Sequence, residues 1–192
     1  VPLLIRERKG EKILPWSHGV ASEEAQKTQT TSWAVLIKSL FKVFILRNSL
    51  LLAATGFLLN FAVNFIETLL PVFTVQKLGW TDQVYSQYYS SANLIGGIGG
   101  MIIGGLLIDR FGKKKMINMY FLLFGLLFLA FYLGKDYWTN KMFVGGFMTL
   151  FLALYVFTSI GFFALAMQSC WKKVSATQFT LYMAIANMGY SL

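Results

Sequence analysis

Four long apolar runs, and a fifth that starts near residue 174, dominate this chain. The four extend over residues 49–74, 84–108, 116–134 and 142–168. A run of about 18 or more apolar residues is long enough to cross the roughly 30 Å hydrocarbon layer of a bilayer as a helix. The sequence therefore predicts an all-α, multi-pass transmembrane helical bundle of about five helices, the last one truncated. We expect a fragment of a larger membrane protein embedded in the lipid bilayer.

The basic residues predict which end of the bundle faces the cytoplasm. Of the 17 lysines and arginines, 14 precede the first run, join the second run to the third, or follow the fourth. Cytoplasmic loops of membrane proteins carry such an excess, so residues 1–47 are expected on the cytoplasmic side. Because the basic residues cluster beside apolar runs, the net charge of +9 does not indicate a nucleic-acid partner.

The segment before the first run divides into two parts. Residues 1–31 are polar and irregular, and we expect them to form a cytoplasmic linker. Over residues 32–47 apolar side chains recur at helical spacing, while Lys38, Ser39 and Lys42 fall on the opposite side. This pattern is typical of an amphipathic helix on a membrane surface. A helix packed on a soluble core is disfavoured because the chain has little soluble core.

A short charged loop joins the second run to the third. It reads Gly-Leu-Leu-Ile-Asp-Arg-Phe-Gly-Lys-Lys and resembles the signature loop of the major facilitator superfamily of secondary transporters, with the motif residues Gly105, Asp109, Arg110, Gly112, Lys113 and Lys114. In that family the loop is cytoplasmic and joins the second and third helices of a six-helix half. Residues 48–192 therefore resemble helices seven to eleven of a twelve-helix transporter, whose missing N-terminal half would be a partner.

The resemblance implies a conformational role for this loop. Asp109 and Arg110 are expected to belong to a charge network that locks one conformation, with partners in the missing half. Just before the loop, small residues recur every four positions, at Gly96, Gly100 and Gly104. Helices in lipid gain no hydrophobic drive toward each other, so small residues that allow close backbone approach favour helix packing. We interpret these three glycines as a packing surface.

Glu67 is the one acidic residue well inside a predicted membrane run. Burying a carboxylate in a bilayer is costly unless it is protonated, paired or facing water, so such residues are usually functional. Asn60 and Asn64 lie on the same helical face. Our hypothesis is that this face lines a transport cavity and that Glu67 takes part in proton coupling or substrate binding. The alternative is that Glu67 lies near the outer interface, shortly before Pro71, and is simply solvated.

Three further amides on predicted helices are assigned to the same substrate and proton pathway: Asn93, Gln178 and Asn187. With one histidine and one cysteine, the sequence offers no metal cluster and no nucleophilic triad. A membrane-embedded enzyme would need such a group or an acid pair near a helix end. We therefore expect neither enzymatic activity nor a cofactor.

The segment Ser175-Ala-Thr-Gln-Phe179 narrows the resemblance. Leading into a helix of small residues, it is similar to AmpG-type muropeptide permeases, which belong to the peptide and acetyl-CoA transporter branch. This implies proton-driven import of anhydro-muropeptides across the bacterial inner membrane for cell-wall recycling. A transporter of acetyl-CoA, a sugar or a drug remains an alternative, as does a non-transporting membrane receptor or scaffold.

Overall fold

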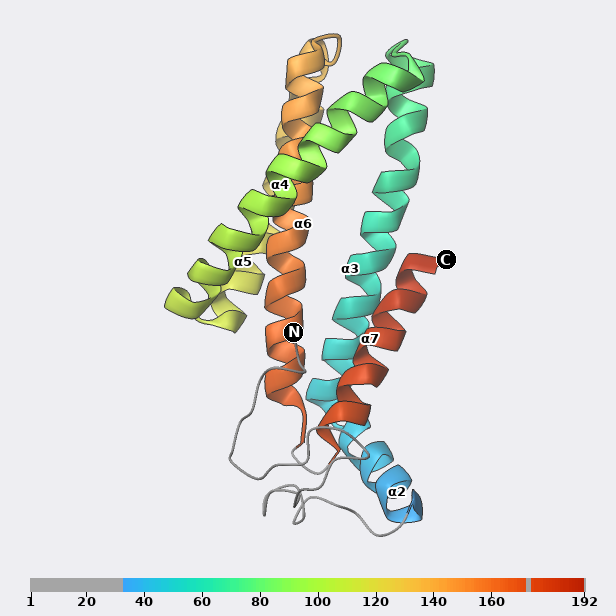
Figure 1. The fold of residues 1–192 in the computed structure, drawn as a ribbon, viewed down its shortest axis with the longest axis vertical. Helices are drawn as coiled ribbons and strands as arrows, with labels where there is room; N and C mark the ends of the chain where they lie inside the picture. Colours follow the sequence, from blue (N-terminus) through green and yellow to red (C-terminus); the bar gives the residue numbers. More distant parts are fainter. Residues whose placement is uncertain (1–32, 172–173, 192) are drawn as a thin grey trace, which may run out of the picture.

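The computed structural model describes residues 33–171 and 174–191, and within this part the chain is helical (Figure 1). The predicted linker over residues 1–31 lies outside the described residues. The elements are α2 (Trp33–Phe44), α3 (Arg47–Pro71), η2 (Val72–Lys77), α4 (Asp82–Phe111), α5 (Lys113–Leu133), η3 (Lys135–Tyr137), α6 (Lys141–Ser169) and α7 (Ser175–Ser191).

Four of these helices are long and apolar enough to cross a membrane: α3 with η2, α4, α5 and α6. The predicted all-α, multi-pass class is confirmed. The described part of α7 has 17 residues. Figure 1 shows the connections alternating between the two ends of the bundle, with α2, the α4–α5 turn and the base of α7 at the lower end. The basic residues of α2 and of the α4–α5 turn therefore share one end.

The helix α2 leaves apolar side chains uncovered beside its basic ones. Ile37 and Phe41 are 53% and 65% exposed, and Lys38 and Lys42 are exposed as well, whereas Val43 is buried. An exposed apolar side flanked by lysines is the arrangement that an interfacial helix presents to a bilayer. The membrane-surface role of residues 32–47 remains a prediction.

Close helix packing joins α4 to α6 through the three glycines at four-residue spacing. Gly96, Gly100 and Gly104 are all buried. A Cβ atom added at Gly96 would lie 2.7 Å from the backbone oxygen of Thr149, and one added at Gly104 would lie 2.6 Å from Cδ1 of Phe157. At Gly96 the two backbones thus approach to a distance that only glycine allows, and at Gly104 the space beside α4 is filled by the Phe157 ring.

The turn between α6 and α7 is held by one buried glutamine. The Oε1 atom of Gln178 accepts a hydrogen bond from the backbone N–H of Trp171 at 2.9 Å, and its Nε2 donates to the Tyr182 hydroxyl at 2.8 Å. The same Nε2 lies 3.5 Å from the backbone oxygen of Ser169. Gln178 is fully buried, so its amide ties the end of α6 to the first turns of α7.

After Pro71 the first membrane helix continues as a π-turn, beyond the end that the sequence predicts. Proline has no N–H to donate and its ring crowds the preceding turn, so the regular hydrogen-bond pattern is interrupted there. The N–H of Leu78 bonds to the Phe73 oxygen at 3.2 Å, and the N–H of Trp80 to the Thr74 oxygen at 3.0 Å. The buried Thr74 hydroxyl donates to the Leu70 oxygen at 2.8 Å, which satisfies a carbonyl near the break.

Replacing Gly96 with alanine is expected to destabilise the bundle, because the added methyl group meets the α6 backbone. Overpacking of this kind costs about 1–3 kcal/mol, which exceeds the roughly 1 kcal/mol that alanine gains over glycine in a helix. The matched control is Gly97→Ala, where an added Cβ atom meets nothing within 4 Å. Thermal unfolding in detergent should show a lower midpoint for Gly96→Ala only. Equal midpoints would contradict the packing surface.

Replacing Gln178 with leucine is expected to loosen the α6–α7 turn and to make Cys170 more reactive. Burial raises the pKa of the Cys170 thiol, so thiolate is scarce near neutral pH and reaction with maleimide is slow. In Gln178→Leu the loosened turn admits water, and a given labelling rate should be reached at lower pH. Peptide mass spectrometry across a pH series measures this, with the exposed Thr177→Val as control. Identical pH profiles in all three proteins would contradict the proposed role of Gln178.

Candidate functional site

Glu67 is held from two other helices. It lies on α3, one turn before Pro71, and is half-buried. The Tyr89 hydroxyl of α4 donates to Oε1 at 3.1 Å, and the Tyr190 hydroxyl of α7 donates to Oε2 at 2.7 Å. Each carboxylate oxygen therefore receives a hydrogen bond from a different helix. Hydrogen bonds to an ionised carboxylate are about twice as strong as neutral ones.

A second polar contact lies two helical turns away on the same face of α3. The Oδ1 atom of Asn60 accepts a hydrogen bond from the Tyr155 hydroxyl of α6 at 3.3 Å. Its Nδ2 donates to the Gly56 oxygen at 3.3 Å. Seven residues separate Asn60 from Glu67, which corresponds to about 10 Å along the helix axis. The helices α3, α4, α6 and α7 thus all contribute polar groups to one region, which we call the Glu67 site.

The other predicted pathway residues differ in their relation to the Glu67 site. Asn64 is half-buried on the same face of α3, between the two polar contacts. Asn93 is exposed one turn after Tyr89 and donates to the Tyr89 backbone oxygen at 3.2 Å. Asn187 is exposed one turn before Tyr190.

Gln178, the remaining predicted pathway residue, is not part of the Glu67 site. Its polar atoms are engaged in the α6–α7 turn, where it is fully buried. The structure therefore gives this residue a role in holding two helices together, whereas the sequence led us to expect a residue of the pathway.

Three tyrosines that contact Glu67 and Asn60 were not predicted from the sequence: Tyr89, Tyr155 and Tyr190. A signal was present in the sequence, because a tyrosine hydroxyl inside an apolar helix usually has a hydrogen-bond partner. Tyrosines near helix ends are also typical of the membrane interface, however, so composition alone does not distinguish the two roles.

The signature loop lies at the other end of α4. Gly112 alone separates α4 from α5, with φ +87° and ψ 144°, a backbone conformation that favours glycine. Asp109, Arg110 and Lys114 are exposed, Lys113 is half-buried, and the region around Gly105 is open. Twenty residues separate Asp109 from Tyr89, which is about 30 Å of helix. The loop is thus remote from Glu67, and its role in a charge network remains a prediction.

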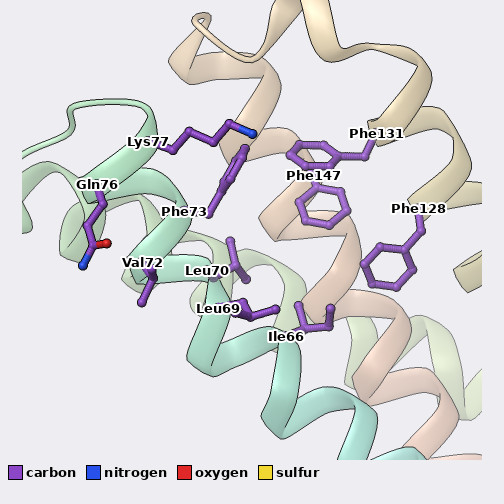
Figure 2. Close-up of a pocket in the computed structure, with 10 residues that line it drawn as sticks. All are labelled: Ile66, Leu69, Leu70, Val72, Phe73, Gln76, Lys77, Phe128, Phe131 and Phe147. Atoms are coloured by element: carbon purple, nitrogen blue, oxygen red, sulfur yellow. The ribbon is translucent and has the colours of Figure 1, made fainter.

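The side of α3 next to the Glu67 face borders an apolar pocket (Figure 2). The pocket has a volume of about 620 Å³ and lies between α3 with η2 and the helices α5 and α6. Ile66, Phe128, Phe131 and Phe147 project into it in the view of Figure 2. At its rim, Lys77 Nζ lies 5.7 Å from the ring centre of Phe73. The lining contains no acidic residue, so we do not assign proton chemistry to it.

Comparison with known protein families gives a match over nearly the whole chain. The family model described as Major Facilitator Superfamily matches residues 5–192, which include all four candidate membrane helices and the signature loop. The searches of curated proteins and of solved structures each found no match. Members of this superfamily are secondary transporters of the membrane and not enzymes. The chain belongs to the major facilitator superfamily.

Proposed function

We propose that this chain is part of a proton-coupled secondary transporter and that Glu67 is the carboxylate that carries the coupling proton. The observation that supports this most is the position of Glu67 on a membrane helix, with hydrogen bonds from α4 and α7. A carboxylate at such a position is costly to keep unless it serves a function. Residues 48–192 would supply helices seven to eleven, and the other half of the transporter would close the solute pathway.

The geometry of the site suits reversible proton binding. The Glu67 carboxylate is contacted by two tyrosine hydroxyls, each of which can donate to an unprotonated oxygen or accept from the oxygen that carries the proton. A carboxylate paired to a fixed arginine or lysine would bind a proton less readily. The hydroxyl partners therefore support a group that changes its protonation state during a transport cycle.

For the solute we propose a muropeptide-like molecule, imported across a bacterial inner membrane. The support is the similarity of residues 175–179 to AmpG-type permeases. Gln178 within this segment forms hydrogen bonds in the α6–α7 turn. The similarity of the segment therefore supports a family relationship with AmpG-type permeases, but it does not support a contact between this segment and the solute. Acetyl-CoA, a sugar or a drug is the competing cargo, and a receptor or scaffold is the competing role.

Uptake by the full-length protein tests both parts of the proposal. Labelled anhydro-muropeptide and acetyl-CoA are offered in parallel to energised membrane vesicles of both orientations. We expect muropeptide uptake that depends on the proton gradient in the wild type and falls to background in Glu67→Gln at equal expression. Asp82→Asn, an exposed acid at the start of α4, is the matched control and should keep wild-type uptake.

The possible outcomes test the role of Glu67 and the identity of the solute separately. Equal muropeptide uptake in Glu67→Gln and the wild type would make Glu67 structural and leave the solute assignment standing. Uptake of acetyl-CoA without uptake of muropeptide would identify acetyl-CoA as the solute in place of muropeptide. If neither solute moves in either orientation, the muropeptide assignment fails. If, in addition, replacing Glu67 and Asn64 alters abundance alone, the receptor or scaffold role is favoured.

A further inference from the structure

The closest packing in the membrane region forms two helix sets. The first set is α3 with α7, where an added Cβ atom at Gly189 would collide with the backbone oxygen of Phe57. The second set is α4 and α5 on α6, with the glycine contact at Gly96. Figure 1 shows α3 beside α7, and α4 crossing α6. Backbone meets backbone between α3 and α7 and between α4 and α6, whereas α3 and α6 approach each other mainly through side chains.

Two tyrosine hydroxyls cross from the second set to α3 of the first set, and a further crossing contact, from Gln178 of α7 to the backbone oxygen of Ser169 of α6 at 3.5 Å, lies at the α6–α7 turn. Tyr89 of α4 donates to Glu67 of α3 at 3.1 Å. Tyr155 of α6 donates to Asn60 of α3 at 3.3 Å. The bond from Tyr190 to Glu67, in contrast, stays within the first set and is shorter, at 2.7 Å. Glu67 is therefore bound firmly to its own set by one oxygen and linked to the other set by the second oxygen.

We propose that Tyr89 is a positioning residue that links the protonation of Glu67 to the distance between the two helix sets. An ionised carboxylate accepts the Tyr89 hydrogen bond with the strength of a charge-assisted contact. A proton on Oε1 turns this oxygen into a donor, so the Tyr89 hydroxyl must rotate to accept from it, and the charge-assisted bond is replaced by a weaker neutral one. The link between the sets near Glu67 then weakens, while the bond between Tyr155 and Asn60 and the Gln178 contacts at the α6–α7 turn remain. That this proton is the one coupled to transport rests on the proposed function.

The surroundings of Glu67 favour such a switch. The titratable groups that face it are tyrosines from three packed helices: Tyr85 and Tyr89 of α4, Tyr155 of α6 and Tyr190 of α7. Each of these neighbours presents a hydroxyl that can donate to a carboxylate or accept from a carboxylic acid. Beyond Glu67, the interrupted helix at Pro71 and η2 offers a joint between α3 and α4.

Spin labels test the link without any solute. In the full-length protein in nanodiscs, with Cys170→Ser, exposed Met101 of α4 and Met188 of α7 are replaced with labelled cysteines to report on the distance between the sets. A second pair at Met101 and Met167 of α6 reports within one set. Distances are measured by electron–electron double resonance over a pH series.

We expect the distribution between the sets to shift on acidification in the wild type and the distribution within one set to stay constant. Tyr89→Phe should show the acidic distribution at every pH, as should Glu67→Gln. Tyr88→Phe is the matched control, because the Tyr88 hydroxyl contacts the Met142 sulfur at 3.9 Å and not Glu67. It should behave as the wild type. A Tyr89→Phe protein that keeps the wild-type pH response overturns the proposal.

A transport measurement separates this proposal from the function. In proteoliposomes with an imposed pH difference, Tyr89→Phe should lose the dependence of anhydro-muropeptide accumulation on that difference, and Tyr88→Phe should retain it. Accumulation that requires Glu67 but is unchanged in Tyr89→Phe overturns the link and leaves the proposed function standing. A pH-dependent shift between the sets that disappears in Tyr89→Phe, in a protein that moves no solute, supports the link and overturns the proposed function.

Discussion

The absence of water in the hydrocarbon layer is the constraint on which this structure depends. Backbone N–H and C=O groups find no solvent partner there, so each membrane segment must form a helix. Once formed, the helices gain nothing by hiding apolar surface from lipid, so contact between them comes from close packing and polar groups. The glycines of α4 and α7 supply the first, and the tyrosine hydroxyls around Glu67 and Asn60 supply the second.

These two kinds of contact have different consequences. A glycine contact places backbone against backbone, as between Gly96 and Thr149, and it does not depend on protonation. The contact between Tyr89 and Glu67 does depend on it, because one partner is ionisable. A transporter needs both properties, since parts of the protein must move as rigid units while their separation responds to an ion. In this chain α3 and α7 share both kinds of contact, through Gly189 and through Tyr190, whereas α3 and α4 are joined by the Tyr89 hydrogen bond.

Much of the fold was predictable from the sequence, but little of the site was. Apolar runs and basic loops give the number and direction of the helices, because lipid imposes one length and one secondary structure. Glu67 was found because a lone carboxylate in an apolar helix is unusual. Its partners come from Tyr89 and Tyr190, which are 22 and 123 residues away, and such distant contacts leave no periodic trace.

The single residue between α4 and α5 has a consequence for how this protein can change during evolution. With only Gly112 in the connection, the rotation of α5 about its axis is fixed by the end of α4. One inserted residue would turn α5 by about 100° and displace it by about 1.5 Å. Tyr120 and Met116, both buried, would then face lipid, and α5 would present a different side to α6. Insertions and deletions at this connection should be far rarer among related transporters than substitutions of its charged residues.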